Sequence, residues 1–156
     1  MRAIRFFYHT DFFLSNEAQV ADWLLSVLTN EGVEVLSVDY SFVDKKQMIK
    51  INKKHLKHNY LTDVLAFDYS ENNKIQGDVF ISEEKVRANA QEYSQDFSKE
   101  LINCLNSCFR ASCSSCENSD STSASRALAA ASSSIILVVP SEVVRIRVEL
   151  SSEAFL

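Results

Sequence analysis

The residues best placed to do chemistry are six lysines between Asp44 and His58, in a chain whose formal net charge is −5. With the one carboxylate of Asp44, the six lysines give this segment a net charge of +5. Lysine ammonium groups bind nucleic-acid phosphates without reading the base sequence. We therefore predict a phosphate-binding surface made of Lys46, Lys50, Lys53, Lys54, Lys57 and His58. The alternative is a solvated helix face that binds no ligand.

Two further groups of side chains are of types that bind metals. His55 and His58 lie three residues apart and precede Asp63, and the three make one candidate ligand set. The alternative is that both histidines belong to the basic surface and that Asp63 orients the turn before the next strand. The second group is Cys104, Cys108, Cys113 and Cys116. Its spacing does not match the usual zinc patterns, and disulfides are not expected in a reducing compartment.

Local patterns predict the elements that position these residues. Alternating or β-rich runs indicate strands at 3–8 and 33–43, and helical spacing indicates helices at 16–31 and 45–57. A polar residue followed by glutamine three residues later is typical of a capping box, which starts the helices at Asn16 and Asp44. Gly32 is expected to end the first helix.

The next part of the chain predicts a hairpin followed by helices. Two β-rich runs, 62–69 and 77–82, are separated by the turn-forming residues 70–73. Helical spacing then extends from 83 to 105, with a break near 94–96. Asp78, which follows Gly77, is interpreted as a turn residue and not as a catalytic carboxylate. Such strands and helices together predict an α/β fold, with helices packed on a mixed sheet.

The composition changes after residue 105. Eleven of the 28 residues from 107 to 134 are serine, and hydrophobic periodicity fades. Such sequence buries too little hydrophobic surface to offset its ordering entropy, so we predict that this stretch packs poorly. Further on, Val144, Ile146, Val148 and Leu150 alternate with polar residues and form either an edge strand or loose chain. The predicted organisation is one domain over 1–105 and an atypical serine-rich tail over 106–156.

Bulk composition narrows the class of protein. The hydrophobic share of 46% and the charged share of 24% are those of a globular domain. Only two glycines and one proline occur, which argues against a loop-rich or all-β fold. No signal-peptide pattern and no membrane-length hydrophobic run is apparent, so a cytoplasmic location is expected.

Two short motifs resemble those of a known family. The run TDVLAF at 62–67 is followed by GDVFIS at 77–82. This pair resembles the YbeY family of rRNA maturation factors, the metal-dependent endoribonucleases of bacteria, over about residues 3–105. The resemblance implies a three-layer α/β domain with a mixed sheet and a groove for RNA. The resemblance implies that the lysine surface binds RNA, and that the partner is ribosomal RNA or the small ribosomal subunit. Binding to a membrane or to DNA is not expected.

The resemblance also implies a zinc cofactor held by three histidines. Its motif, His-Gly-x-Leu-His-Leu-x-Gly-Tyr-x-His, would place these ligands at Ser107, Ala111 and Glu117, none of which is histidine. A single-strand-specific hydrolase that uses metal-activated water needs those ligands. The chain as written is therefore expected to be inactive as a zinc-dependent endoribonuclease, and no catalytic residue is assigned. The alternative function is a non-catalytic RNA- or ribosome-binding module that uses the lysine-rich helix.

A shifted reading frame is one interpretation of the tail. Reading one base later allows histidine codons at 107 and 111, but Cys108 then gives no glycine, so one shift does not restore the motif. Two smaller departures lie in the domain itself. Leu56 stands where the family often has arginine, and Leu61 where it often has proline.

Overall fold

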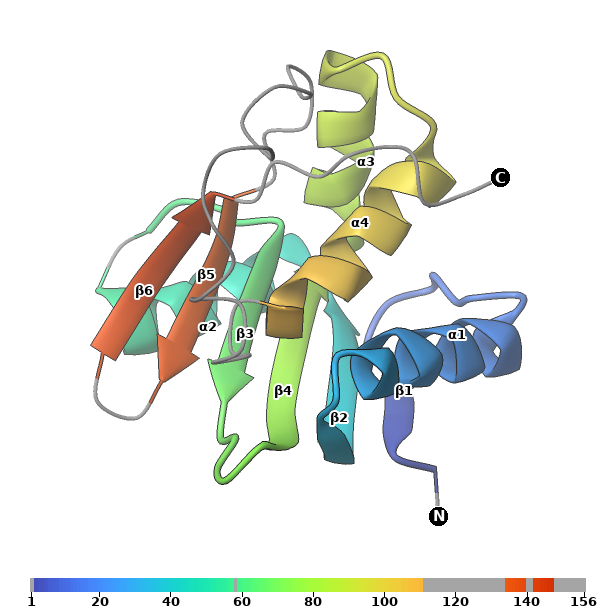
Figure 1. Ribbon diagram of the computed structural model, residues 1–156. Helices are drawn as coiled ribbons and strands as arrows, with labels where there is room; N and C mark the ends of the chain where they lie inside the picture. The colour runs from blue at the N-terminus through green and yellow to red at the C-terminus, as the bar shows by residue number, and fades with distance from the viewer. Residues whose placement is uncertain (1, 58, 111–133, 140–141, 148–156) are drawn as a thin grey trace, which may run out of the picture.

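The computed structural model describes residues 2–57, 59–110, 134–139 and 142–147. Within these residues, a mixed sheet carries helices on both faces, which confirms the predicted α/β fold (Figure 1). The strands are β1 (Ile4–Tyr8), β2 (Glu34–Val43), β3 (Val64–Asp68), β4 (Lys74–Ser82), β5 (Ser134–Val139) and β6 (Glu142–Arg147). The helices are α1 (Glu17–Asn30), α2 (Lys45–Leu56), α3 (Glu83–Glu92) and α4 (Phe97–Arg110).

The strand order is β1-β2-β4-β3-β5-β6. β1, β2 and β4 run parallel, whereas β3 pairs antiparallel with β4 and parallel with β5. The predicted hairpin is confirmed as β3 and β4. Its turn contains Asn72 and Asn73, whose φ angles of 50° and 62° are those of the tight turns that match strand twist. A bridge between Glu71 and Lys74 closes the turn.

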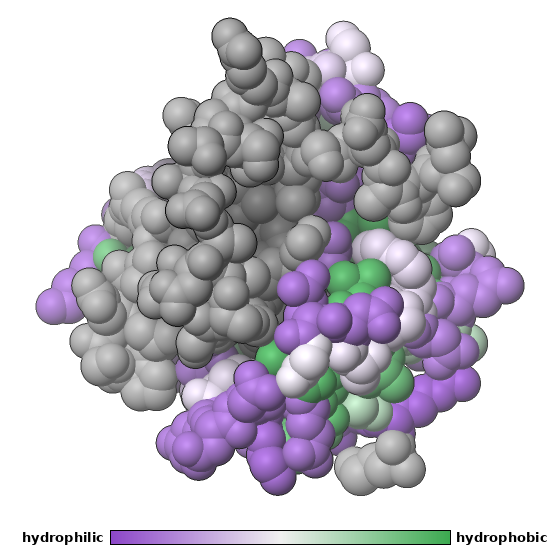
Figure 2. Space-filling view, in the orientation of Figure 1, coloured by the Kyte–Doolittle hydropathy of each residue, from purple (hydrophilic) through white to green (hydrophobic). Residues whose placement is uncertain are grey.

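The two faces of the sheet carry different cores. On one face, α1, α3 and α4 cover strand residues such as Val38, Tyr40 and Phe42, which are all buried. On the other face, α2 places Met48 against Leu65 and their neighbours in a smaller core. Figure 1 shows α1 and α4 in front of the sheet and α2 behind it. In Figure 2, the described surface of the front face is mostly hydrophilic, with hydrophobic patches around α1.

Of the two predicted capping boxes, the one at Asp44 is present and the one at Asn16 is not. At α2, the Asp44 carboxylate accepts from the Gln47 backbone N at 2.7 Å, and the Asp44 N donates to the Gln47 side chain at 3.2 Å. The box at Asn16 was wrongly predicted. The φ and ψ angles of Asn16, −119° and 38°, lie outside the extended region that a cap requires, and its side chain makes no capping hydrogen bond. Gly32 ends α1 as predicted, at a φ of 77°.

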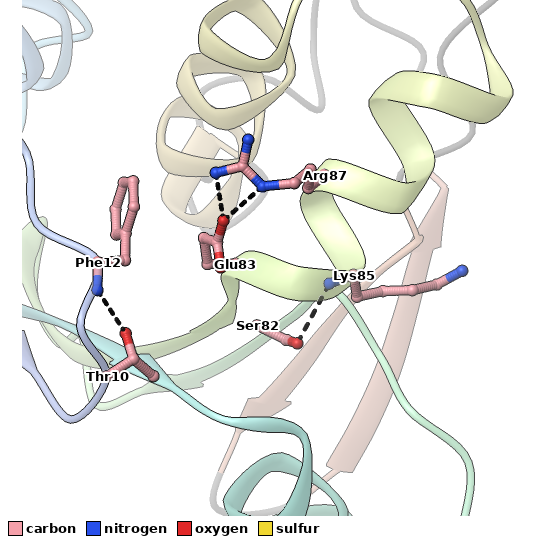
Figure 3. A network of polar contacts seen from close by, with 6 residues as sticks. All are labelled: Thr10, Phe12, Ser82, Glu83, Lys85 and Arg87. Atoms are coloured by element: carbon pink, nitrogen blue, oxygen red, sulfur yellow. Dashed lines mark hydrogen bonds and ion pairs between the residues drawn. The ribbon is translucent and has the colours of Figure 1, made fainter.

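The predicted break near 94–96 is confirmed between α3 and α4. Ser94 takes a left-handed conformation with a φ of 52°. At the start of α3, the Ser82 hydroxyl accepts from the Lys85 N at 3.4 Å (Figure 3). One turn later, the Arg87 Nε donates to Glu83 at 2.7 Å, and the Arg87 guanidinium lies 4.2 Å from the ring centre of Phe97 in α4. The two helices are thereby joined at the surface.

The structure describes residues 106–110, 134–139 and 142–147 beyond the predicted domain end. Helix α4 passes the expected boundary at residue 105 and ends at Arg110, because Cys108 continues the buried face of Leu101, Cys104 and Leu105. The prediction of poor packing is therefore wrong at Cys108. The predicted edge strand is confirmed at Val144 and Ile146, since β6 pairs with β5 at the sheet edge. Residues 111–133, Val148 and Leu150 lie outside the described residues, and the division into domain and tail stays a prediction.

Candidate nucleic-acid interface

Helix α2 presents the predicted lysines on its outer surface. Met48 and Asn52 face inward and are fully buried, so the helix is held on one side only. Lys46, Lys50, Lys53, Lys54 and Lys57 are all exposed, at spacings that place them on neighbouring turns. Among the described residues, no carboxylate forms an ion pair with these lysines. The structure therefore brings five of the six predicted residues together, and the sixth, His58, lies outside the described residues.

A buried asparagine fixes the end of α2. The Asn52 side-chain amide donates to the Tyr60 carbonyl at 2.9 Å and to the Thr62 hydroxyl at 3.0 Å. The Thr62 hydroxyl lies 3.3 Å from the Asn52 Oδ1 and donates to it. Lys57, with a φ of 58°, turns the chain between these partners. The lysine surface is thus tied directly to the Thr62-Asp63 motif, a contact that no local sequence signal indicated.

His55 and Leu56 lie at the end of α2, and Leu61 lies in the segment between α2 and β3. His55 is exposed to solvent, and its ring centre lies 4.7 Å from the ring centre of Phe67 in β3, in an edge-to-face arrangement. Burial, and then the nearby charge of Lys54, lower the pKa of His55. Leu56 and Leu61 pack against the smaller core. Hydrophobic contact explains both leucines at positions where the resemblance expects arginine and proline.

A buried polar cluster lies behind the motif, on the side of α3 and α4. Asp63 accepts from the Asn89 amide at 3.1 Å and from the Val64 backbone N at 3.0 Å. Burial raises the pKa of Asp63 to about 6, and the charge of buried Glu100 adds to the rise. The bond to Val64 confirms that Asp63 orients the turn into β3. Asn89 and Glu100 were missed at the sequence level, because nothing in a helix sequence indicates a distant buried carboxylate.

The residues of this region do not fit the zinc site that the resemblance implies. Ser107 lies in α4 as a serine, and its neighbour Cys108 donates its Sγ–H to the Cys104 carbonyl at 2.9 Å. Burial raises the pKa of the Cys108 thiol, which disfavours the thiolate form that binds metals. In the part of the chain that the structure describes, no three His, Cys, Asp or Glu side chains form a metal-binding group. The other proposed ligand positions, Ala111, Cys113, Cys116, Glu117 and His58, lie outside it.

Asp78 occupies a different position from the one predicted. It lies inside β4, opposite Asp39 of β2 on one side and Phe67 of β3 on the other. The turn prediction was wrong because strand pairing on both sides overrides the local turn tendency of a Gly-Asp pair. Burial raises the pKa of Asp78, and the charge of Asp39 raises it further. Across the same row, Arg5 of β1 binds the Asp39 carboxylate through two hydrogen bonds of 2.6 and 2.7 Å.

A family model and individual relatives match the same part of the chain. A family model described as Endoribonuclease YbeY matches residues 10–106 of the chain. The chain belongs to the YbeY endoribonuclease family. Endoribonuclease YbeY of Flavobacterium johnsoniae is 41% identical over 98 residues, which cover 63% of this chain and 70% of that protein. The same enzyme of Flavobacterium psychrophilum is 39% identical over the same shares of the two chains.

A solved structure supports the fold alone. A Thermotoga maritima protein, determined in solution, is 22% identical, with a TM-score of 0.50 over 64% of this chain and 65% of its own. The YbeY family match includes α2, the Thr62-Asp63 motif and Gly77-Asp78, and it ends at residue 106, before Ser107. None of the described helices is long and hydrophobic enough to cross a membrane.

Proposed function

We propose that this chain binds RNA through the exposed lysines of α2 and does not, as written, cleave RNA by a metal-dependent route. The observation that carries the proposal is the helix itself. Four of the predicted lysines lie exposed on α2 and the fifth, Lys57, directly follows it, without carboxylate partners among the described residues, in a chain of net charge −5. Local positive charge of this kind supplies the sequence-independent part of nucleic-acid binding.

Family membership suggests the RNA. Relatives of this chain are named endoribonucleases, which act on RNA. We propose ribosomal RNA, free or in the small ribosomal subunit, as the partner, and the cytoplasm as the location. The anchoring of α2 by Asn52 supports this role, because a fixed helix loses little conformational freedom when its lysines meet a phosphate backbone.

The proposed lack of metal-dependent cleavage rests on side-chain chemistry. Zinc binding in such an enzyme requires neutral imidazole or thiolate ligands around an open position for water. Serine stands at 107, alanine at 111 and glutamate at 117, and burial raises the pKa of the Cys108 thiol. Phosphate binding does not depend on these positions, so binding and cleavage are separable.

Membership in a family named for its nuclease activity favours a second candidate function. In that case the chain is a single-strand-specific endoribonuclease that uses a zinc-activated water, with ligands elsewhere in the chain. Cleavage of a structured RNA by the purified full chain, stimulated by zinc and abolished by a chelator, is the result that would establish this candidate and overturn the first.

Binding is tested on the same samples by fluorescence anisotropy with a labelled single-stranded RNA at several salt concentrations. We expect affinity to fall steeply with salt, and the variant Lys53→Glu/Lys54→Glu/Lys57→Glu to lose at least about tenfold in affinity at low salt. Lys53→Glu and Lys99→Glu form a matched pair, because both residues are exposed on helices and both changes alter the charge equally. Equal losses from the two changes would contradict the role of α2.

A further inference from the structure

Part of the sheet face that carries α2 is left open. In β1, Ile4, Phe6 and Tyr8 enter the larger core, so Arg5 and Phe7, which alternate with them, point to the opposite face. In the part of the chain that the structure describes, helix α2 covers that face around Val43, Leu65, Phe67 and Phe80. Beyond it, large hydrophobic side chains remain in solvent. Phe7 is 42% exposed, Leu36 46% and Tyr69 46%.

The open face combines these rings with carboxylates. Arg5 lies 5.9 Å from the ring centre of Phe7 and is held by Asp39. Asp78 neighbours Asp39 in the next strand, and the nearby charge of Asp78, after burial, raises the pKa of the Tyr69 hydroxyl. Leu36 and Tyr69 together line a shallow hollow beside the β3–β4 turn. The surface therefore combines exposed aromatic rings with carboxylates, and its cations Arg5 and Lys74 are paired with Asp39 and Glu34.

This face is continuous with the lysine helix. Phe67 is the register partner of Asp78 in the sheet. The His55 ring of α2 contacts the Phe67 ring. Tyr69 follows Phe67 by two residues, so it emerges on the same face just beyond the end of the helix contact. A ligand that lies across the open face thus reaches both the exposed rings and the cations of α2.

We propose that the open face binds the unpaired bases of single-stranded RNA while the α2 lysines hold its phosphates. The rings of Phe7 and Tyr69 supply stacking surfaces, and the Asp78 carboxylate accepts hydrogen bonds from amino groups on the base edges. Among the described residues, the α2 lysines carry positive charge that no carboxylate pairs, so the phosphates lie on the α2 side of this face. Base-paired RNA hides its bases and does not fit this surface. The inference rests on the proposed RNA-binding function and adds the surface that the bases contact.

The test compares aromatic truncations on and off the open face. Phe7→Ala and Tyr69→Ala are measured beside Phe13→Ala, because Phe13 is 69% exposed in the segment between β1 and α1. The probes are a single-stranded RNA 12-mer, a duplex of equal length and inorganic polyphosphate. We expect each open-face change to weaken single-strand binding about tenfold, with an unchanged salt slope. Binding of duplex and polyphosphate is expected to stay at the wild-type level, which also shows that the variants are folded.

Tyr69→Phe keeps the ring and is expected to retain single-strand affinity. Wild-type affinity for the 12-mer in both Phe7→Ala and Tyr69→Ala, with the α2 lysine variants still defective, would overturn the inference and leave the lysine proposal standing. This is the result expected if the face receives another protein and not RNA. Absence of RNA and polyphosphate binding in the unaltered chain would overturn both proposals.

Discussion

The two faces of the sheet differ in how completely helices cover them. The same strands send Val38, Tyr40 and Phe42 into a closed core on one face, and Asp39 and its neighbours toward an open surface on the other. Among the described residues, three helices cover the first face, whereas α2 alone covers part of the second. Most of the buried hydrophobic contacts that stabilise the fold therefore lie on the first face. The second face keeps exposed lysines and aromatic rings, which we propose to bind RNA.

The largest expected effect lies in the closed core. Phe42 is fully buried, with ring centres 5.4 Å from Tyr8 and 5.0 Å from Phe12. Phe42→Ala is expected to lower the free energy of unfolding by about 3 to 5 kcal/mol, because the cavity cannot collapse fully. Phe7→Ala on the open face is expected to lower it by less than about 1 kcal/mol. Urea unfolding measures both, and equal losses would show that the two faces do not divide in this way.

A smaller effect is expected from pH. The folded pKa of Asp63, about 6, lies above its ordinary value, so the folded state binds this proton more tightly than the unfolded state. Stability conferred through Asp63 is therefore expected to rise as pH falls from about 7 to about 4, by roughly 1 to 3 kcal/mol. Asp63→Asn should remove this component in urea unfolding at several pH values. A pH dependence that is the same in both proteins would mean that Asp63 ionises normally.

The anchor of α2 links stability to binding. Asn52→Leu leaves the Tyr60 carbonyl and the Thr62 hydroxyl without their amide partner, which is expected to cost about 1 to 3 kcal/mol. RNA affinity should fall as well, because the last turn of α2 loses its attachment. Asn59→Ala, at an exposed asparagine close by, is the control for both measurements. Lower stability with unchanged RNA affinity would separate the anchor from the interface.

The smallest effect is expected at the surface contact between α3 and α4. Arg87→Ala removes both the ion pair with Glu83 and the contact with Phe97, and is expected to cost about 0.5 to 1 kcal/mol. Glu83→Gln removes the ion pair but keeps Arg87 over the Phe97 ring, so the difference between the variants reports the ring contact. A loss comparable to that of Phe42→Ala would mean that the surface of this face contributes as much as its core.

Local patterns in the sequence predicted local structure well and long-range contacts poorly. The β3–β4 hairpin and the Asp44 capping box follow from residues that are adjacent in the chain, and both are present. The Asp63–Asn89 bond joins residues of different elements, so no periodicity indicates it. Asp78 shows the same limit, since its place inside the sheet depends on two partner strands. The lysine surface was predictable because a helix with one buried side exposes the rest.

The most direct test of the two-face account is an amide NMR titration of the full chain with a single-stranded RNA 12-mer. We expect shift changes or broadening at residues of α2, at Phe7 and at Tyr69, with α1 and the outer surface of α3 unaffected. This pattern would place the RNA on the face that α2 leaves partly open. Changes concentrated on α1 and α3, with α2 unaffected, would contradict the account.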